Sequence, residues 1–155
     1  MDKIIFDTKV QFIKYKVLKE VITKAYNDDL VNAYRDIPKT IIPSELGRYI
    51  AYFSKDDVDK IKNTNSTGKF LSEMFEGYIN RYGLDITQTN DLCAVMYMLY
   101  PEIFESYKCD IVVDTNSVPG KTTITPNKNG LINFVENTNR EVFVQKFLEN
   151  LKQMP

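Results

Sequence analysis

The chain has 155 residues, carries 20 basic and 21 acidic side chains, and contains no histidine. This length suits one domain over residues 1–155, and the balanced charge offers no basic surface of the kind that nucleic-acid binding requires. The absence of histidine excludes His-based nucleophilic triads and zinc sites that use histidine. No apolar run approaches the ~20 residues of a membrane span, and two cysteines are too few for a disulfide framework. We therefore expect a cytoplasmic protein with no membrane or nucleic-acid partner.

The first quarter of the chain predicts a strand within residues 1–10, followed by two helices. Apolar residues recur at helical spacing over 9–26, and the lysines of that helix form a solvated outer face or, less simply, a surface for a membrane or an acidic partner. Asp28 and Asp29 begin a second helix that ends at Arg35. We read this pair as a helix cap rather than as metal ligands, because consecutive side chains on a helix do not converge on one point.

The middle of the chain predicts a short strand and two helices. Residues 38–43 form a strand bounded by prolines, which places it at a sheet edge or a strand end. Ser54 begins a capped helix with Val58 and Ile61 as its buried positions. The polar run 63–68 reads as a loop, and it lacks the full pattern of a phosphate-binding loop. Residues 70–82 form a helix closed by a glycine, and the apolar residues on it are core rather than a base-stacking platform.

Residues 89–104 are the most informative stretch of the sequence. Thr89 or Asn90 can cap a helix, and Asp91 falls in its first turn, where unpaired N–H groups favour negative charge. Leu92, Val95, Met96 and Leu99 recur at helical spacing, so we expect this helix to be buried on most sides. A carboxylate at the start of a buried helix is either a simple cap or part of a functional site.

The C-terminal third predicts three strands, over 109–115, 120–125 and 131–135, and a final helix over 140–152. Asp110 and Asp114 share one face of the first of these strands with Val112. Paired carboxylates there could perform acid–base chemistry, but two charges that face water explain them equally well. The alternation of strands and helices along the chain indicates an α/β fold.

This series of elements resembles the C-terminal part of the calcium-dependent nucleoside hydrolases. It runs from a helix with Asn-Asp at its start, through Pro-Glu-Ile-Phe and three strands that include Pro-Gly-Lys-Thr-Thr, to the helix Asn-Arg-Glu-Val-Phe-Val-Gln-Lys-Phe-Leu. Members of that family, often called inosine-uridine preferring, cleave the N-glycosidic bond of ribonucleosides. The resemblance extends back to 37–43. It implies a truncated nucleoside-hydrolase-like α/β domain that ends in β strands followed by a terminal helix.

The chain departs from the family where the chemistry is expected. The family begins with a strand that ends in Asp-x-Asp-x-x-x-Asp-Asp, whose carboxylates hold calcium and the attacking water. Here Asp7 matches the first aspartate, but Lys9 stands at the second and Ile13-Lys14 at the final pair. The family helix begins with His-Asp, where this chain has Asn90-Asp91. The resemblance therefore implies vestigial metal ligands at Asp7 and Asp91, a catalytic position without its proton donor at Asn90, and a charge replacement at Lys9.

The simplest account of these departures is a large internal deletion that joins a first strand to the C-terminal half of the family. Three functions then remain: a working calcium-dependent N-ribohydrolase, a degenerate non-catalytic relative, and a subunit or interaction module that completes a site with another chain. We favour the second. We expect no cofactor, although the family uses calcium, and the partners to consider are a ribonucleoside, a second copy and a longer nucleoside hydrolase.

Overall fold

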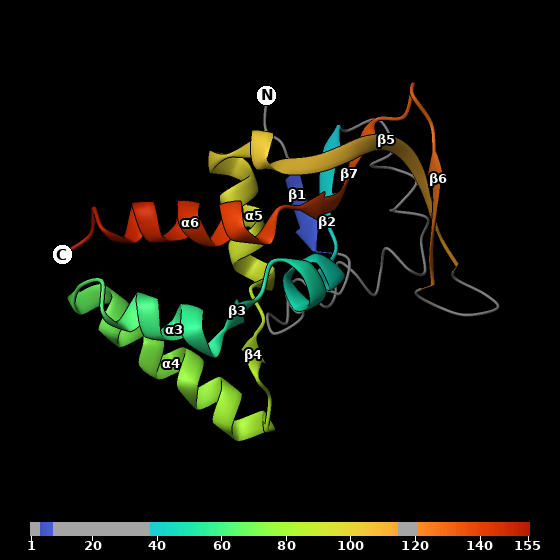
Figure 1. The fold of residues 1–155 in the computed structure, drawn as a ribbon. Helices are drawn as coiled ribbons and strands as arrows, with labels where there is room; N and C mark the ends of the chain where they lie inside the picture. The colour runs from blue at the N-terminus through green and yellow to red at the C-terminus, as the bar shows by residue number, and fades with distance from the viewer. Residues whose placement is uncertain (1–3, 8–37, 115–120) are drawn as a thin grey trace. The chain divides into compact units, whose positions relative to one another are not determined.

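The computed structural model describes residues 4–7, 38–114 and 121–155 and divides the chain into two compact units (Figure 1). The first, here called the sheet unit, comprises Met1–Ile42 and Ser106–Glu136. The second, the helical unit, comprises Pro43–Glu105 and Asn137–Pro155. The helices expected over 9–26 and 27–35, and Lys9 with them, lie outside the described residues. The expectation of one domain over 1–155 stays a prediction.

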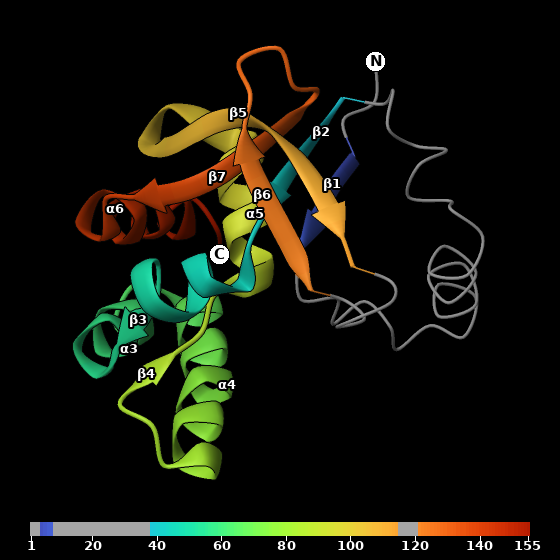
Figure 2. The ribbon, with the colours of Figure 1, turned by 90° about the vertical axis from the view of Figure 1, so that its right-hand side faces the viewer.

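Among the described residues, one sheet contains five strands in the order β1-β2-β7-β5-β6 (Figure 2). Its strands are β1 (Ile4–Asp7), β2 (Lys39–Ile42), β5 (Phe104–Val113), β6 (Thr122–Pro126) and β7 (Ile132–Thr138). β2 runs parallel to both β1 and β7, whereas β5 and β6 run antiparallel to each other. Of the two expected positions, the sheet edge is wrong, because β2 lies between β1 and β7, whereas the strand end is confirmed for both prolines. Pro38 and Pro43 stand just outside the strand, where a missing N–H group removes no ladder hydrogen bond.

The core of the sheet unit comes from inward-facing residues of its neighbouring strands. Ile41, Cys109 and Phe134 are buried together, and Tyr107, Ile111, Ile124 and Ile132 pack against them. The rings of Tyr107 and Phe134 lie 5.7 Å apart, a normal separation for a stabilising aromatic pair. Burial raises the pKa of the Cys109 thiol, so this cysteine is a packing residue rather than a reactive thiolate.

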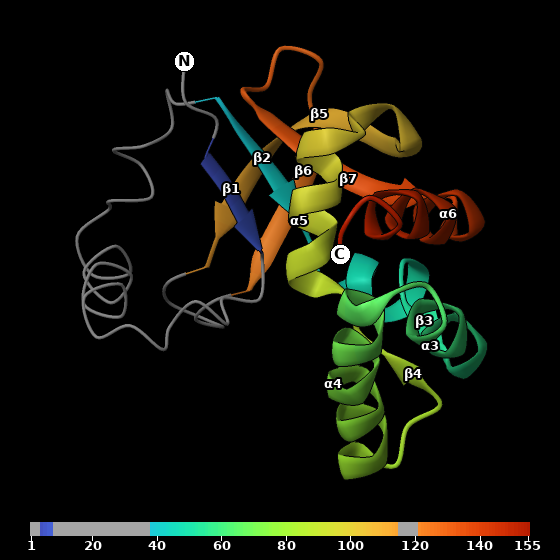
Figure 3. The same ribbon diagram turned by 90° about the vertical axis from the view of Figure 1, so that its left-hand side faces the viewer.

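The helical unit packs helices around a small two-stranded sheet. Its elements are η2 (Leu46–Ile50, one π-helical turn), β3 (Phe53–Ser54), α3 (Lys55–Lys62), α4 (Ser66–Tyr82), β4 (Ile86–Thr87), α5 (Asn90–Leu99), η3 (Pro101–Ile103) and α6 (Arg140–Leu151). β3 and β4 pair antiparallel, and α3 and α4 lie side by side (Figure 3).

Phe53 stands at the centre of this unit. It is fully buried, and its ring centroid lies 5.6 Å from that of Phe75 on α4, 6.2 Å from that of Phe143 and 4.9 Å from that of Phe147 on α6. Phe143 also meets Phe104 edge to face at 6.2 Å. Each such pair adds about 0.5–1.5 kcal/mol beyond the burial of its surface. Aromatic packing thus joins β3, α4 and α6 into one core.

Local signals in the sequence set several element ends. The capping box at Ser54 is present, and Val58 and Ile61 are buried as expected. Gly83 closes α4 with a φ of 62°, a conformation that glycine adopts without strain. The loop expected over 63–68 is too long, because the Asn65 side chain accepts a 2.8 Å bond from the Gly68 N–H and starts α4 at Ser66.

Two helices are less buried than their patterns predict. On α5 only Cys93 and Met96 are buried, whereas Val95, Met98 and Leu99 are 51%, 70% and 57% exposed. Met74 of α4, expected in the core, is 58% exposed. The strand predictions also shift, since β5 begins at Phe104 and ends at Val113 rather than spanning 109–115. Among the residues that the structure describes, no helix is both long and apolar enough to cross a bilayer.

Candidate functional site

The first turn of α5 is fastened to η2 by Thr89. The Thr89 N–H donates a 3.1 Å hydrogen bond to the Gly47 carbonyl, and the Thr89 hydroxyl donates to the Ala51 carbonyl. The same hydroxyl lies 3.4 Å from the Cys93 thiol. Thr89 occupies the N-cap position, but its side chain makes no capping bond to the helix. Thr89 therefore does not cap α5 with its side chain as expected, and instead links α5 to η2 by hydrogen bonds.

Asn90 is packed against the backbone of η2. Its side-chain oxygen is buried and makes no hydrogen bond among the described residues. A methyl group on Gly47 would lie 2.6 Å from the Asn90 backbone nitrogen and 2.7 Å from that side-chain oxygen. Because both separations are far below van der Waals contact, only glycine permits this approach. The buried Asn90 amide oxygen therefore lies beside Gly47, and an amide carries no titratable proton.

The other two described residues of the predicted site belong to different units. Asp91 is exposed in the first turn of α5, where the partial positive charge of the helix terminus favours a carboxylate. Asp7 is the last residue of β1 and pairs in register with Ile42 of β2. Asp7 belongs to the sheet unit, whereas Asn90 and Asp91 belong to the helical unit.

These residues do not fit the calcium that the resemblance implies. Calcium takes about 6–8 oxygen ligands, several of them carboxylates. Asp91 is exposed, and the buried Asn90 oxygen faces Gly47. Within residues 4–7, 38–114 and 121–155, no group of three or more His, Cys, Asp or Glu side chains could hold a metal ion. No chemical step can be derived through calcium at this place.

Asp110 and Asp114 are described in the sheet unit as well. Asp110 and Val112 are exposed on the same face of β5, in agreement with the expected alternation. The Asn127 side chain donates a 2.7 Å hydrogen bond to the Asp110 carboxylate, which connects β5 to the turn after β6. This contact favours the structural reading of Asp110.

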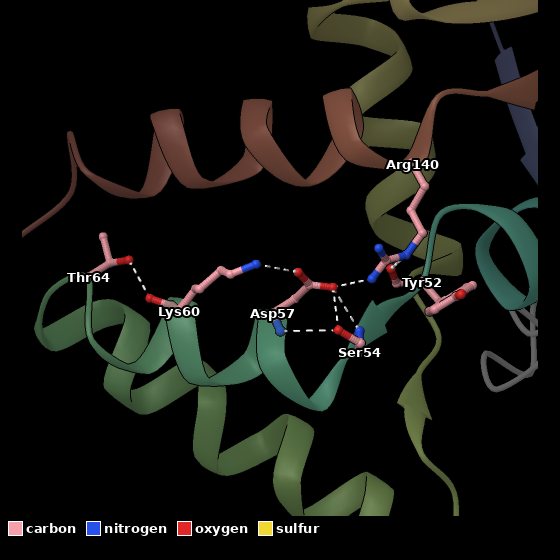
Figure 4. Close-up of polar contacts among 6 residues, drawn as sticks. All are labelled: Tyr52, Ser54, Asp57, Lys60, Thr64 and Arg140. Atoms are coloured by element: carbon pink, nitrogen blue, oxygen red, sulfur yellow. Dashed lines mark hydrogen bonds and ion pairs between the residues drawn. The ribbon is translucent and has the colours of Figure 1, made fainter.

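A polar cluster at the start of α3 was not expected as a whole (Figure 4). Asp57, 4% exposed, accepts a 3.0 Å bond from the Ser54 N–H and a 2.8 Å bond from the Ser54 hydroxyl. The Arg140 guanidinium, from the first residue of α6, forms an ion pair with the same carboxylate oxygen. Lys60 lies 3.4 Å from the other oxygen. The Ser54–Asp57 spacing predicts the cap, but nothing local identifies Arg140, which is 83 positions away in sequence.

Arg140 has further partners that hold it in place. Its Nε donates a 3.2 Å hydrogen bond to the Tyr52 carbonyl, and its guanidinium carbon lies 4.4 Å from the centroid of the Tyr52 ring. Burial alone would raise the pKa of Asp57. The Ser54 hydrogen bonds and the charges of Arg140 and Lys60 outweigh it and lower that pKa. The cluster therefore ties the start of α3 to the start of α6 by a charged pair.

Comparison with known proteins adds both sequence and structural relatives. No family model matches the sequence. A segment of 65 residues is 32% identical to the non-specific ribonucleoside hydrolase RihC of Salmonella paratyphi A, and equally to that of Salmonella newport. This match covers 42% of the chain but only 21% of the relative.

The fold is similar to two solved nucleoside hydrolases. A plant nucleoside hydrolase, the PpNRh1 enzyme, has a TM-score of 0.59 and 13% identity over 76% of this chain and 42% of its own. An inosine-guanosine nucleoside hydrolase has a TM-score of 0.60 and 18% identity over 75% of this chain and 39% of its own. The aligned part of this chain thus covers about two fifths of each solved relative.

Proposed function

We infer that this chain, which is nucleoside-hydrolase-like in fold and in part of its sequence, is a degenerate relative of those enzymes without N-ribohydrolase activity of its own. The observation that carries this inference is the burial of the Asn90 oxygen against Gly47. At the position where the resemblance expects a proton donor, the chain has an amide that is used for packing.

The chemistry of glycoside cleavage supports the same proposal. Hydrolysis requires an activated water, which a bound metal supplies by lowering the pKa of that water. It also requires a group that protonates the leaving base, and general acid catalysis of this kind contributes about 10²–10⁴-fold. Asn90 cannot donate a proton by titration, and the chain contains no histidine at all. Asp91 supplies a single exposed carboxylate.

The proposal is tested by measuring ribose release from inosine and from uridine, each with calcium and with a chelator. The expected result is no release above the buffer rate under either condition. Asp91→Asn is the informative variant, because it removes the one matched carboxylate of α5 while keeping its shape. Chelator-sensitive ribose release that Asp91→Asn abolishes would show that the protein is an active hydrolase and would overturn the proposal.

A second candidate is a subunit that completes a ribonucleoside site with another chain. Its support is coverage, since the aligned part of this chain accounts for about two fifths of each solved relative. Its ligand would be a ribonucleoside of the inosine–uridine type, and its other partner a longer nucleoside hydrolase or a second copy. Co-expression with a longer nucleoside hydrolase distinguishes the two candidates: a stable complex with altered turnover favours this one, and independent elution favours the first.

We also propose that the protein resides in the cytoplasm and needs no cofactor. Cys93 and Cys109 support the location, because both are buried and neither forms a disulfide, as is usual in a reducing compartment. The mismatch between the described carboxylates and calcium coordination supports the second point.

A further inference from the structure

An Asn-Gly pair lies in the turn that joins β6 to β7 in the sheet unit. The turn spans residues 127–130, and the Gly130 N–H donates a 2.9 Å hydrogen bond to the Asn127 carbonyl. Asn129 is exposed, whereas Gly130 is buried. Asn-Gly is a common turn sequence, because both residues adopt turn conformations readily. It is also the pair in which an asparagine side chain is most open to attack by its own backbone.

The chemistry of this pair is deamidation through a cyclic imide. The Gly130 backbone nitrogen, once it has given its proton to water, attacks the side-chain carbonyl carbon of Asn129. A carbon–nitrogen bond forms, the bond to the side-chain amino group breaks, and ammonia leaves. Water then opens the ring, which gives aspartate or isoaspartate without any change in oxidation state. Glycine favours this attack, because it has no side chain to hinder the approach of its nitrogen.

The folded turn holds the attacking nitrogen in place. Its N–H is already bonded to the Asn127 carbonyl. A methyl group on Gly130 would lie 2.4 Å from the Cys109 carbonyl oxygen, so this residue is in close contact with the backbone of β5. Attack on Asn129 requires the nitrogen to leave its hydrogen bond and to lose its proton, and the closed turn opposes both. Exposure of Asn129 therefore does not by itself make the residue reactive.

Asn127 is the residue that keeps the turn closed. Its side-chain oxygen accepts a 3.0 Å hydrogen bond from the Asn129 N–H, and its side-chain nitrogen donates a 2.7 Å bond to the Asp110 carboxylate. Its backbone N–H donates a 2.9 Å bond to the Lys108 carbonyl. Together with the bond that its carbonyl accepts from Gly130, these contacts use every polar group of Asn127 and attach the turn to β5.

We propose that Asn129 is a deamidation site controlled by the contacts of Asn127, slow to react in the closed turn and fast when the turn opens. The rate in the folded protein then follows the small fraction of molecules in which the turn is open. Isoaspartate adds one atom to the backbone before Gly130 and moves its nitrogen away from the Asn127 carbonyl. Each such event therefore breaks the turn that had prevented it and loosens the connection from β6 to β7.

Peptide mass spectrometry tests the proposal after the full chain is incubated in mildly alkaline buffer, with and without guanidinium chloride. The measured quantity is protection, which is the deamidation rate of Asn129 in the unfolded chain divided by its rate in the folded protein. We expect protection of about tenfold or more in the natural sequence. Asn127→Ala should lower it at least fivefold. Lys128→Ala is the matched control, because Lys128 is exposed in the same turn, and it should leave protection unchanged.

Division by the unfolded rate removes any effect of a substitution on the intrinsic chemistry. Each variant must also keep a cooperative unfolding transition by circular dichroism, so that lost protection reports the turn and not the whole fold. If Asn127→Ala does not fold, Asp110→Ala takes its place, since it removes the side-chain partner of Asn127. Equal rates in the folded and unfolded natural protein would overturn the proposal. So would full protection in the folded variant, or the same loss of protection in Lys128→Ala.

Discussion

Asn90 stands at the position where the resemblance expects a proton donor, and here its side chain packs against the protein instead. In the helical unit its oxygen fills the space left by the missing side chain of Gly47. Asn90 therefore packs against η2, although its buried oxygen lacks a hydrogen-bond partner among the described residues and so carries a cost in free energy. The same reasoning implies that the family's residue type would not fit here without rearrangement.

Replacing Asn90 with histidine therefore should destabilise the protein and should not create turnover. The imidazole ring is larger than the amide and would press on the Gly47 backbone, and overpacking of this kind costs about 1–3 kcal/mol. Urea unfolding gives the stability change, and the ribose assay gives the activity. Asn90→His with wild-type stability would contradict the packing described here.

Asp57 is the residue on which the charged contact between α3 and α6 depends. Asp57→Asn leaves the Arg140 guanidinium without its counter-charge in a partly buried position, and we expect a loss of about 3 kcal/mol in the free energy of unfolding. Asp85→Asn is the control, because Asp85 pairs with Lys55 on the surface and should cause no measurable change. Equal effects of the two substitutions in urea unfolding would refute this role of Asp57.

The same carboxylate predicts a pH dependence. The pKa of Asp57 in the folded protein lies below its ordinary value of 3.8. Its contribution to stability is therefore complete above the pKa of the unfolded chain and disappears as the pH falls through the lower folded value. Urea midpoints measured from about pH 6 to about pH 3 should fall less steeply in Asp57→Asn than in the natural sequence. Parallel pH profiles would contradict the lowered pKa.

At the scale of elements, the packing of α3 against α4 depends on one glycine. A methyl group on Gly68 would collide with the Ile61 carbonyl oxygen, so Gly68→Ala must push the two helices apart. We expect a loss of about 1–3 kcal/mol. Gly77→Ala on the same helix meets only open space and should add up to about 1 kcal/mol to monomer stability. Thermal unfolding in dilute solution compares the two, and a stabilising Gly68→Ala would contradict the close approach.

The elements were predictable from sequence to the extent that their signals are local. The cap at Ser54, the helix end at Gly83 and the alternation around Val112 each depend on a few neighbouring residues, and the structure agrees with all three expectations. Periodicity alone could not show that Val95 and Met98 are exposed, because an apolar stripe indicates which residues share a face but not what covers it. The Arg140–Asp57 pair and the approach of Gly47 to Asn90 join distant segments, which no local pattern reports.

At the scale of the whole molecule, the resemblance to nucleoside hydrolases rests on order and fold more than on chemistry. Similarity to solved relatives covers about three quarters of the chain, whereas the matched sequence covers 42% of it. Fold persists through such change because it depends on many packed residues, while catalysis depends on a few. The residues that would carry the chemistry are divided between the sheet unit, with Asp7, and the helical unit, with Asn90 and Asp91.

Calorimetric titration of calcium into the full chain tests the loss of the family's metal site most directly. The account predicts no saturable heat up to about 1 mM calcium, where even weak protein sites are half filled. The variants Asp7→Asn and Asp91→Asn should give the same titration curve as the natural sequence. A saturable site that either substitution removes would contradict it. Those two carboxylates would then still act together as metal ligands, and loss of the metal site would no longer support the proposed inactivity.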